Sequence, residues 1–395
     1  MSPPHAVVAG AGIGGLTAAV ALHRRGWRVT VCERSPQPSA TGAGIVLAPN
    51  ALRAFDAIGF DAGRAAGRAV PAAMGLRRPD GRWLNRADAS ALTARYGRPP
   101  LAVYRPALAE GLAAALPDTA IHYGARVTGV DHEPGSPDAP VVRTSAGDLR
   151  ADVVLAADGI HSGLRRAYFP DHPGLHYSGA TAWRAVLPAD GPTGQPPATA
   201  ETWGRGERFG VVPLADGRVY LYATAVVPEG HRPADVRAEL LRRFASWHDP
   251  IPALLERIGP ATVLQHDLYD VAAPLPRLHH GRIAWLGDAA HAMTPNLGQG
   301  GCQAVEDAVV LAHLLDAGAD VPAALAAYDA ARRSRTDAIR VRSRRAGRIA
   351  ALSRPLAVAV RDLAVRAAPA TATRRALDDL FDGFTLPERT PRPGA

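Results

Sequence analysis

The chain has 395 residues, a formal net charge of +8 and 47% hydrophobic residues, so it can bury a large core and is expected to divide into two or more domains. Its only cysteines, Cys32 and Cys302, exclude a small disulfide-stabilised scaffold and fit a reducing cytoplasm. We expect no secretion signal and no membrane-spanning segment, and we expect neither a membrane nor a nucleic acid as partner.

The first expected unit, over residues 5–33, is a strand, a glycine-rich turn, a helix and a second strand. In the turn, Gly10 permits the tight bend, Gly12 lets the backbone approach a pyrophosphate, and Gly15 lets helix and strand pack closely. The helix N-terminus attracts the phosphate charge, and Glu33 follows the second strand where an acidic residue bonds ribose hydroxyls. This unit predicts a site for the adenosine diphosphate part of a dinucleotide.

Helices are expected next at residues 51–58 and 106–116, followed by short strands at 121–123, 127–132, 141–144 and 153–156. The strands and the turn residues between them predict a β-meander attached to the nucleotide sheet. The last strand ends in Asp158 and Gly159 and runs into another helix.

A second layer of alternating strands is expected at residues 181–187, 200–203, 209–213, 219–227 and 263–268, with an amphipathic helix at 233–248. Residues 188–197, which are rich in proline and glycine, are expected to form a flexible loop. We interpret this block as a separate substrate domain.

A second glycine-rich segment spans residues 282–303, far later in the chain than the first. It reads as a strand followed by Gly287, Asp288 and His291, and then by a loop from residue 295 to residue 301. Two such segments imply one long cofactor that lies across the sheet and is contacted at both ends, which favours FAD over NAD.

The remainder is expected to be helical, over residues 304–315, 322–351 and 355–381, with a disordered tail over 387–395. The arginine-rich run at 332–348 could be a nucleic-acid footprint. We favour a solvated helix face, because no recognition motif or interleaved aromatic residue accompanies the run.

The predicted fold class is therefore α/β: a Rossmann-like FAD-binding domain with an attached β-meander, a second antiparallel-sheet substrate domain, and C-terminal helices. The expected boundaries are 1–75, 98–175 and 270–320 for the FAD-binding domain, 76–97 and 176–269 for the substrate domain, and 321–386 for the helices.

Three fingerprints, the Gly10 turn with Glu33, the Asp158–Gly159 pair, and the Gly287–Asp288 segment with its following loop, resemble those of the single-component FAD-dependent aromatic hydroxylases. The chain is similar to the branch with salicylate, 3-hydroxybenzoate 6- and flavin-dependent urate hydroxylases. The resemblance implies that NADH or NADPH reduces the flavin and that a 4a-hydroperoxyflavin transfers one oxygen atom of O2 to a small aromatic or other electron-rich substrate. An epoxidase or Baeyer-Villiger-type monooxygenase on the same scaffold, or a non-catalytic flavin-binding protein, stays open as an alternative.

The resemblance also implies cofactor-binding roles for Gly10, Gly12, Gly14, Gly15, Glu33, Arg34, Arg105, Asp158, Gly159, Asp288, Pro295, Leu297, Gly298 and Gly300. Asp288 would bond the ribityl chain, or serve only as a helix N-cap. The loop from Pro295 would present N–H groups to the flavin ring and so contribute to catalysis. Arg105 would reach the cofactor, or only cap the next helix. His291 could equally bond the backbone or contact the cofactor.

Substrate contacts are expected from the second sheet, at Trp183, Arg184, Phe209, Val211, Tyr222 and His266, although each is equally compatible with plain sheet packing. We assign a catalytic role to Arg184, since an arginine there could pair with an acidic substrate or polarise a carbonyl. We find no nucleophilic triad, paired-carboxylate site or metal-ligand spacing, and expect no metal.

Overall fold

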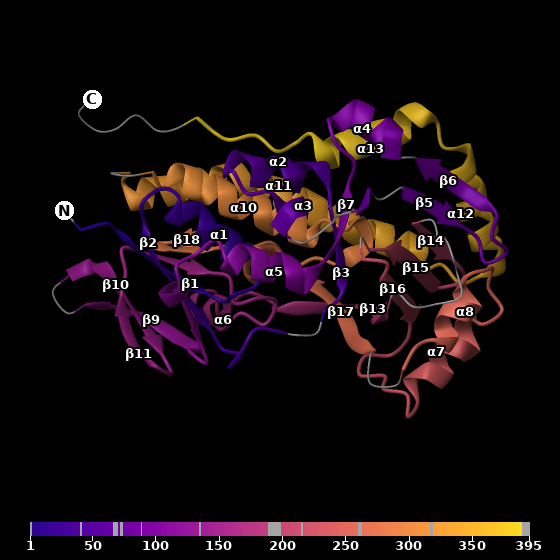
Figure 1. Cartoon of the computed structure of the whole chain (residues 1–395), viewed down its shortest axis with the longest axis horizontal. Coiled ribbons are helices and arrows are strands. Elements are labelled where there is room, and N and C mark those ends of the chain that lie inside the picture. Colours follow the sequence, from indigo (N-terminus) through magenta and orange to yellow (C-terminus); the bar gives the residue numbers. More distant parts are fainter. Residues whose placement is uncertain are drawn as a thin grey trace.

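The computed structural model describes residues 2–39, 42–65, 70–71, 74–87, 89–133, 136–188, 199–214, 216–259, 263–316 and 319–388. A parallel sheet with its meander forms one end of the elongated molecule, and a larger sheet forms the other (Figure 1). The helices α10 (Gly300–Leu314) and α11 (Val321–Ala350) run along one side of the parallel sheet, and α11 continues toward the larger sheet (Figure 1).

The parallel sheet has the strand order β18-β19-β12-β1-β2-β8. Its strands are β1 (His5–Ala9), β2 (Arg28–Glu33), β8 (Ile121–Tyr123), β12 (Val153–Ala156), β18 (His279–His280) and β19 (Ile283–Trp285). The central strands β1 and β12 are buried along their whole length, as continuous apolar strands covered on both faces must be. One covering layer contains α1 (Ile13–His23), which packs against α10. The predicted α/β fold class is confirmed.

The remaining elements of this end lie around that sheet. They are the meander β9 (Val127–Glu133), β10 (Ser136–Thr144) and β11 (Gly147–Arg150), the small sheet β3 (Gly44–Leu47), β4 (Val70–Pro71) and β7 (Leu101–Tyr104), and the helices α2 (Pro49–Ala57), α3 (Ala62–Ala65), α5 (Arg105–Ala113), η1 (Asp118–Ala120), α6 (Gly163–Tyr168), α9 (Asp288–His291) and η3 (Pro295–Leu297). The small sheet was not expected, because its strands are short and come from distant parts of the chain.

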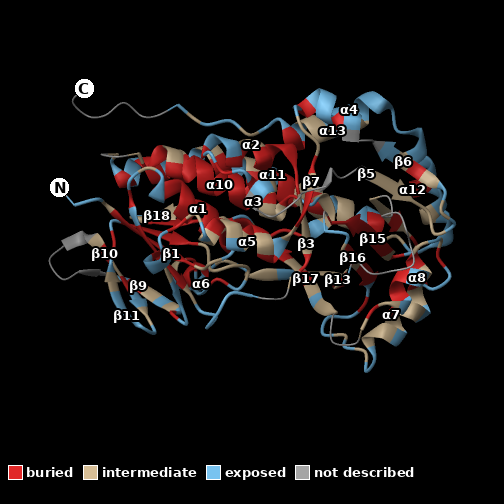
Figure 2. Ribbon diagram, in the orientation of Figure 1, coloured by how far each residue is buried: buried red, intermediate tan, exposed pale blue. Residues whose placement is uncertain are grey.

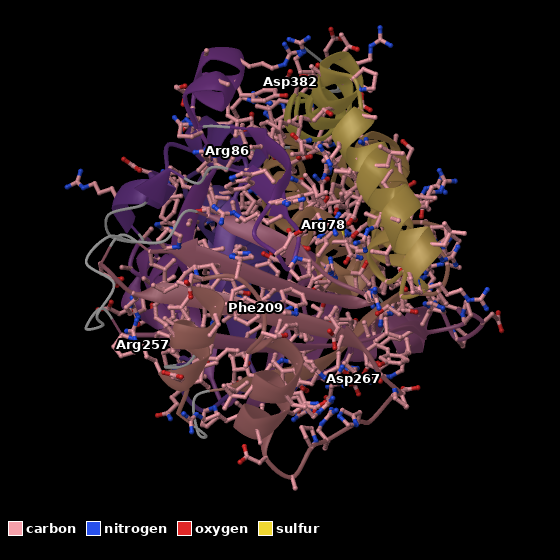
Figure 3. The ribbon with its side chains drawn as sticks, turned by 90° about the vertical axis from the view of Figure 1, so that its right-hand side faces the viewer. Arg78, Arg86, Phe209, Arg257, Asp267 and Asp382 are labelled. Carbon is pink, nitrogen blue, oxygen red and sulfur yellow. The ribbon has the colours of Figure 1, made fainter. Side chains whose placement is uncertain are left out.

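The larger sheet has seven strands in the order β17-β13-β16-β15-β14-β5-β6. They are β5 (Met74–Arg77), β6 (Trp83–Ala87), β13 (Leu175–Leu187), β14 (Ala200–Trp203), β15 (Glu207–Pro213), β16 (Val219–Val226) and β17 (Leu264–Val271). Neighbours pair antiparallel except β14 and β5, which are parallel. Two helices, α7 (Val236–Phe244) and α8 (Ile251–Glu256), cover one face, where Figure 3 labels Phe209 between sheet and helices.

The C-terminal part corrects two expectations. The expected single helix at 355–381 is two helices, α12 (Pro355–Ala367) and α13 (Ala370–Phe381), because Pro369 cannot continue a helix and instead precedes α13. The arginine run on α11 is also not simply a solvated face, since Arg332 and Arg340 are buried among hydrogen-bond partners.

Burial follows the same division of the molecule. Figure 2 shows the parallel strands, α1 and α10 as mostly buried, whereas α12, α13 and α4 (Ala89–Tyr96) present much of their surface to solvent. No described helix is long and apolar enough to cross a membrane. Residues 189–197 of the expected loop and 389–395 of the expected tail lie outside the described residues. The domain boundaries stay a proposal.

Candidate functional site

The predicted cofactor residues follow the carboxyl ends of neighbouring parallel strands. Gly10 follows β1, Glu33 ends β2, Asp158 follows β12 and Asp288 follows β19. In open α/β sheets this edge is where ligands bind, because the strand ends and the helix N-termini meet there. The fold therefore brings the three sequence fingerprints to one place.

Close backbone contacts fix this meeting point. Gly10 has φ of 107°, and a side-chain carbon there would lie 2.5 Å from the carbonyl oxygen of Ala157. A carbon on Gly15 would lie 2.1 Å from the carbonyl oxygen of Gly10. Gly12 differs, since a carbon there would meet nothing within 4 Å. Gly10 and Gly15 thus allow the chain to pack closely on itself, while Gly12 leaves space beside the N-terminus of α1.

Glu33 lies at the mouth of this turn. One of its carboxylate oxygens accepts a hydrogen bond from the Ala11 N–H at 2.8 Å, and the other accepts one from the Ser35 N–H at 2.8 Å. Each carboxylate oxygen can accept a second bond, so Glu33 can still receive ribose hydroxyls. The neighbouring Arg34 is exposed.

The Asp158–Gly159 turn is linked to the late segment by Arg165, a residue that was not predicted from the sequence. The buried Arg165 donates to the backbone oxygens of Asp288 at 3.2 Å and Ala289 at 3.0 Å, and also to that of Ile160. One oxygen of Asp158 caps α6 by accepting from the Gly163 N–H at 2.9 Å. Its other oxygen is buried without a partner among the described residues, so it is free to accept from a ligand.

Asp288 is exposed and stands at the start of α9, after the N-cap residue Gly287. Its carboxylate approaches the start of α10, where an added side-chain carbon on Gly300 would lie 4.0 Å from it. The loop between them contains Pro295 and Leu297 in η3 and ends at Gly298, whose φ of 65° belongs to the left-handed region. A cofactor at this edge would meet carboxylate and loop together.

The same loop is fixed to α11. The side chain of Asn296 donates to the backbone oxygen of Ser343 at 2.9 Å, and the Ser343 hydroxyl donates to that of Thr294. The Val271 N–H at the end of β17 also donates to the Ala292 oxygen at 3.0 Å. Helix α11 and the larger sheet therefore both position the loop.

A buried polar network, which was not predicted from the sequence, lies behind the loop. His291 Nε2 lies 2.5 Å from an Asp307 carboxylate oxygen, which also accepts from the Gly287 N–H at 3.0 Å. Arg332 of α11 donates to the second oxygen of Asp307 at 2.8 Å and to Glu306 at 2.5 Å. His291 thus bonds a carboxylate rather than the backbone. The available signal was the pair of acidic residues in the otherwise apolar segment of α10.

Charge compensation explains how these carboxylates stay ionised while buried. Burial alone would raise their pKa values, but for Asp307 the charges of His291 and Arg332 outweigh burial and hold its pKa below the ordinary value. Arg332 and Arg335 likewise lower the pKa of Glu306. Removing one member would leave the remaining buried charges less fully compensated.

The six predicted substrate residues lie on both faces of the larger sheet. The buried side chains of Trp183, Phe209 and Val211 join the core under α7 and α8. Arg184 and Tyr222 are register partners, and they project from the opposite face because successive side chains of a strand alternate. We call this second face the β3-side face, since its neighbours Val212 and Tyr220 pack against β3 and β7.

Positive charge gathers on the β3-side face. Partial shielding from water and then the charges of Arg184, Arg232 and Arg105 lower the pKa of His266, although its side chain reaches the surface. Burial raises the pKa of Tyr220, against the opposing influence of the same Arg184 and Arg105. Arg105, the first residue of α5, and Arg184 of β13 therefore act electrostatically on the same two side chains. A predicted cofactor residue and a predicted substrate residue thus lie in one region of the molecule.

A second polar group on this face was also missed. Glu201 accepts from the Tyr222 hydroxyl at 2.6 Å and from the Trp203 indole N–H at 2.6 Å, and Arg208 lies 3.4 Å from it. The Tyr222 ring lies so close over Gly210 that a side-chain carbon there would be 2.0 Å from the ring. The result is a fixed aromatic ring beside Arg184.

The residues at the strand ends fit FAD. The open space at Gly12 suits a pyrophosphate, Glu33 suits ribose, and the unpartnered Asp158 oxygen supplies a further acceptor. Among the residues that the structure describes, no group of three potential ligands could hold a metal ion.

Comparisons with known proteins agree with this geometry. A family model described as "FAD binding domain" matches residues 5–343. The aurachin C monooxygenase/isomerase of Stigmatella aurantiaca is 40% identical over 91% of this chain and 93% of that protein. The 2-heptyl-3-hydroxy-4(1H)-quinolone synthase of Pseudomonas aeruginosa strain PAO1 is 33% identical over 95% of this chain and 97% of that protein.

A solved structure is similar along its whole length. HpxO of Klebsiella pneumoniae, crystallised with FAD and uric acid, superposes with a TM-score of 0.86 at 29% identity, and 96% of each chain is covered. The predicted family, enzyme class and FAD cofactor are confirmed, while the roles of individual site residues stay predictions. The chain belongs to the FAD binding domain family and is an FAD-dependent aromatic hydroxylase of the monooxygenase class.

Proposed function

We propose that the substrate is a small, flat, electron-rich ring that carries an acidic or carbonyl oxygen, and that NADH or NADPH supplies the electrons. One atom of O2 enters a ring C–H bond and the other leaves as water. The hydride of the nicotinamide and one proton supply the two reducing equivalents. Bound FAD supplies the redox and oxygen chemistry. The protein's own residues must then bind the ring, orient it and exclude water.

The pair Arg105 and Arg184 carries this proposal. Neither guanidinium has a carboxylate partner within ion-pair distance among the described residues, although carboxylates pair with many other arginines here. Both influence the pKa values of His266 and Tyr220, so both stand at the β3-side face. An anionic or strongly polarised oxygen on the substrate would neutralise Arg184 and favour electron release into the ring.

The fixed Tyr222 ring supports the choice of a flat substrate. Its hydroxyl is held by Glu201, and Glu201 is in turn neutralised by Arg208. An aromatic side chain held in this way offers a planar apolar surface for an aromatic ligand. The names of two relatives point the same way, since one makes a hydroxyquinolone and one was crystallised with uric acid. Quinolones are therefore the first ring class to test.

Two free cysteines support the further proposal of a reducing, cytoplasmic location. Cys32 and Cys302 are both buried and unpaired. Burial raises the pKa of Cys32 to about 11 and that of Cys302 to about 12, so neither thiol is reactive at neutral pH.

The test is substrate-stimulated oxidation of NADH and of NADPH by the FAD-loaded protein. Alkylated 4-quinolones, hydroxylated aromatic acids and urate would be supplied in parallel, with product mass and hydrogen peroxide measured together. We expect at least one ring class to stimulate oxidation about tenfold or more and to gain one oxygen atom with little peroxide. Oxidation that yields only peroxide with every ring class would contradict the proposed substrate, and insertion of oxygen beside a carbonyl without ring hydroxylation would favour the Baeyer-Villiger alternative.

A further inference from the structure

Helix α12 has its polarity reversed relative to an ordinary surface helix. Its buried positions are charged, namely Arg361 and Asp362. Its outward positions are apolar, and Leu356, Val360 and Leu363 are 79%, 60% and 66% exposed, the three highest values among the exposed large apolar residues of the described chain. Single exposed apolar residues are common on proteins, but a cluster on one helix marks a binding surface.

The spacing makes this cluster continuous. Leu356, Val360, Leu363 and Ala367 follow one another by four, three and four residues, so they form one stripe along the helix. Ala359 and Ala364 lie on either side of the stripe and are also exposed. The outer face of α12 therefore offers apolar side chains from its first turn to its last.

Ionic and hydrogen-bonding contacts on the inner side hold α12 in this orientation. Arg361 donates to the Gly204 carbonyl oxygen at 3.1 Å and to Asp362 at 2.9 Å. Arg78, which directly follows β5, lies 3.8 Å from the other oxygen of Asp362. Figure 3 views the molecule from the side that carries α12 and labels Arg78 beside it. Rotating the stripe inward would break these buried contacts, so the exposed stripe is a fixed feature of the fold.

The exposed charged residues of α12 and of its N-cap position are positive. Arg354 is the N-cap residue of α12 and makes no capping hydrogen bond with its side chain, and Arg366 lies in the last turn. Both are exposed, as is Arg348 in the last turn of α11, whereas the one acidic residue of α12, Asp362, is buried. A cation near a helix N-terminus interacts unfavourably with the helix dipole, so the dipole of α12 does not stabilise Arg354 at this position.

We propose that the outer face of α12 binds the surface of an anionic lipid bilayer. The apolar stripe would enter the boundary between headgroups and acyl chains, and the flanking arginines would meet the phosphate groups. A second copy of this chain is the weaker candidate, because pairing two such faces would bring arginines of like charge together. This surface contact does not require the proposed substrate. It departs from the sequence-based expectation of no membrane partner, which rested on the lack of a segment long and apolar enough to span a bilayer.

The experiment is flotation of the full-length, FAD-loaded protein with vesicles of phosphatidylcholine alone or with added phosphatidylglycerol. We expect binding to the anionic vesicles that weakens as salt is raised, because exposed charges are screened. The triple variant Leu356→Ser/Val360→Ser/Leu363→Ser should reduce the bound fraction about tenfold or more. Arg354→Gln/Arg366→Gln should reduce binding to anionic vesicles only.

A matched control is Leu386→Ser, which removes an exposed leucine outside α12 and should leave binding unchanged. FAD content and the melting temperature of each variant show that it is folded. The proposal is overturned if wild-type protein binds neither vesicle, or if the triple variant has no larger effect than Leu386→Ser. A concentration-dependent dimer that the triple variant abolishes, without vesicle binding, would assign the face to self-association instead.

Discussion

The two ends of this molecule hold their candidate functional residues in different ways. At the parallel sheet, backbone constraints define the site: Gly10 and Gly15 lie so close to neighbouring backbone that neither can carry a side chain. At the larger sheet, side chains define it, and adjacent residues such as Trp183 and Arg184 face in opposite directions. The comparison teaches that a glycine motif specifies its own backbone geometry. A strand pattern specifies only that successive side chains point to opposite faces of the sheet.

The buried network behind the cofactor loop should give the largest effect. Replacing Asp307 by Asn removes the carboxylate that His291 contacts and leaves the buried Arg332 with Glu306 as its remaining acidic partner, and we expect a loss of about 3–5 kcal/mol in the free energy of unfolding. Chemical denaturation of wild type and variant measures it. A loss below about 1 kcal/mol would show that side chains are not essential at this end.

The same variant has a predictable pH dependence. The folded-state pKa of Asp307 is held below its value of about 3.9 in the unfolded chain. Its ionised form therefore stabilises the fold fully above the unfolded pKa, and this stabilisation is lost as pH falls toward the folded pKa. The stability difference between wild type and Asp307→Asn should shrink below about pH 4, as the carboxylate of Asp307 becomes protonated.

Two glycine variants test whether backbone packing defines the cofactor end. Gly15→Ala places a carbon against the Gly10 carbonyl and should cost about 3 kcal/mol with loss of FAD. Gly12→Ala meets open space, so the protein without FAD should keep its melting temperature and lose only cofactor affinity. Equal melting temperatures for the two variants would contradict this distinction.

Trp183 and Arg184 provide the corresponding test at the larger sheet. Arg184→Ala should keep FAD and stability but lower kcat/KM about tenfold to a hundredfold and divert NAD(P)H oxidation to peroxide. Trp183→Phe should lower stability and leave coupling intact, because Trp183 packs under α7 and α8. If Trp183→Phe reduces coupling and Arg184→Ala instead lowers only stability, the face assigned to the substrate is wrong.

Asp288 should give the smallest of these effects. Its carboxylate is exposed, so Asp288→Ala should leave the fold unchanged and weaken FAD retention about tenfold. Fluorescence titration of the protein without FAD measures the dissociation constant. A variant that purifies with full flavin occupancy and binds FAD as tightly as wild type would remove Asp288 from the cofactor site.

The sequence by itself determined the cofactor, the family and most elements of the parallel sheet. Gly10, Gly12, Gly15 and Glu33 lie within one strand-helix-strand unit, so their geometry follows from local backbone constraints that a pattern preserves. The same logic placed Asp158 and Asp288 after strands, although their meeting required the sheet order.

Only the tertiary structure decided which side chains face the site and which charges are paired. Glu201, Arg208 and Tyr222 come from three strands, and Asp307 and Arg332 from two helices, so no local spacing relates them. The outward stripe of α12 is a further case, because its helical period is visible in sequence but its orientation depends on buried Arg361. Alternation and periodicity identify two faces of an element, and only packing against its neighbours selects the buried one.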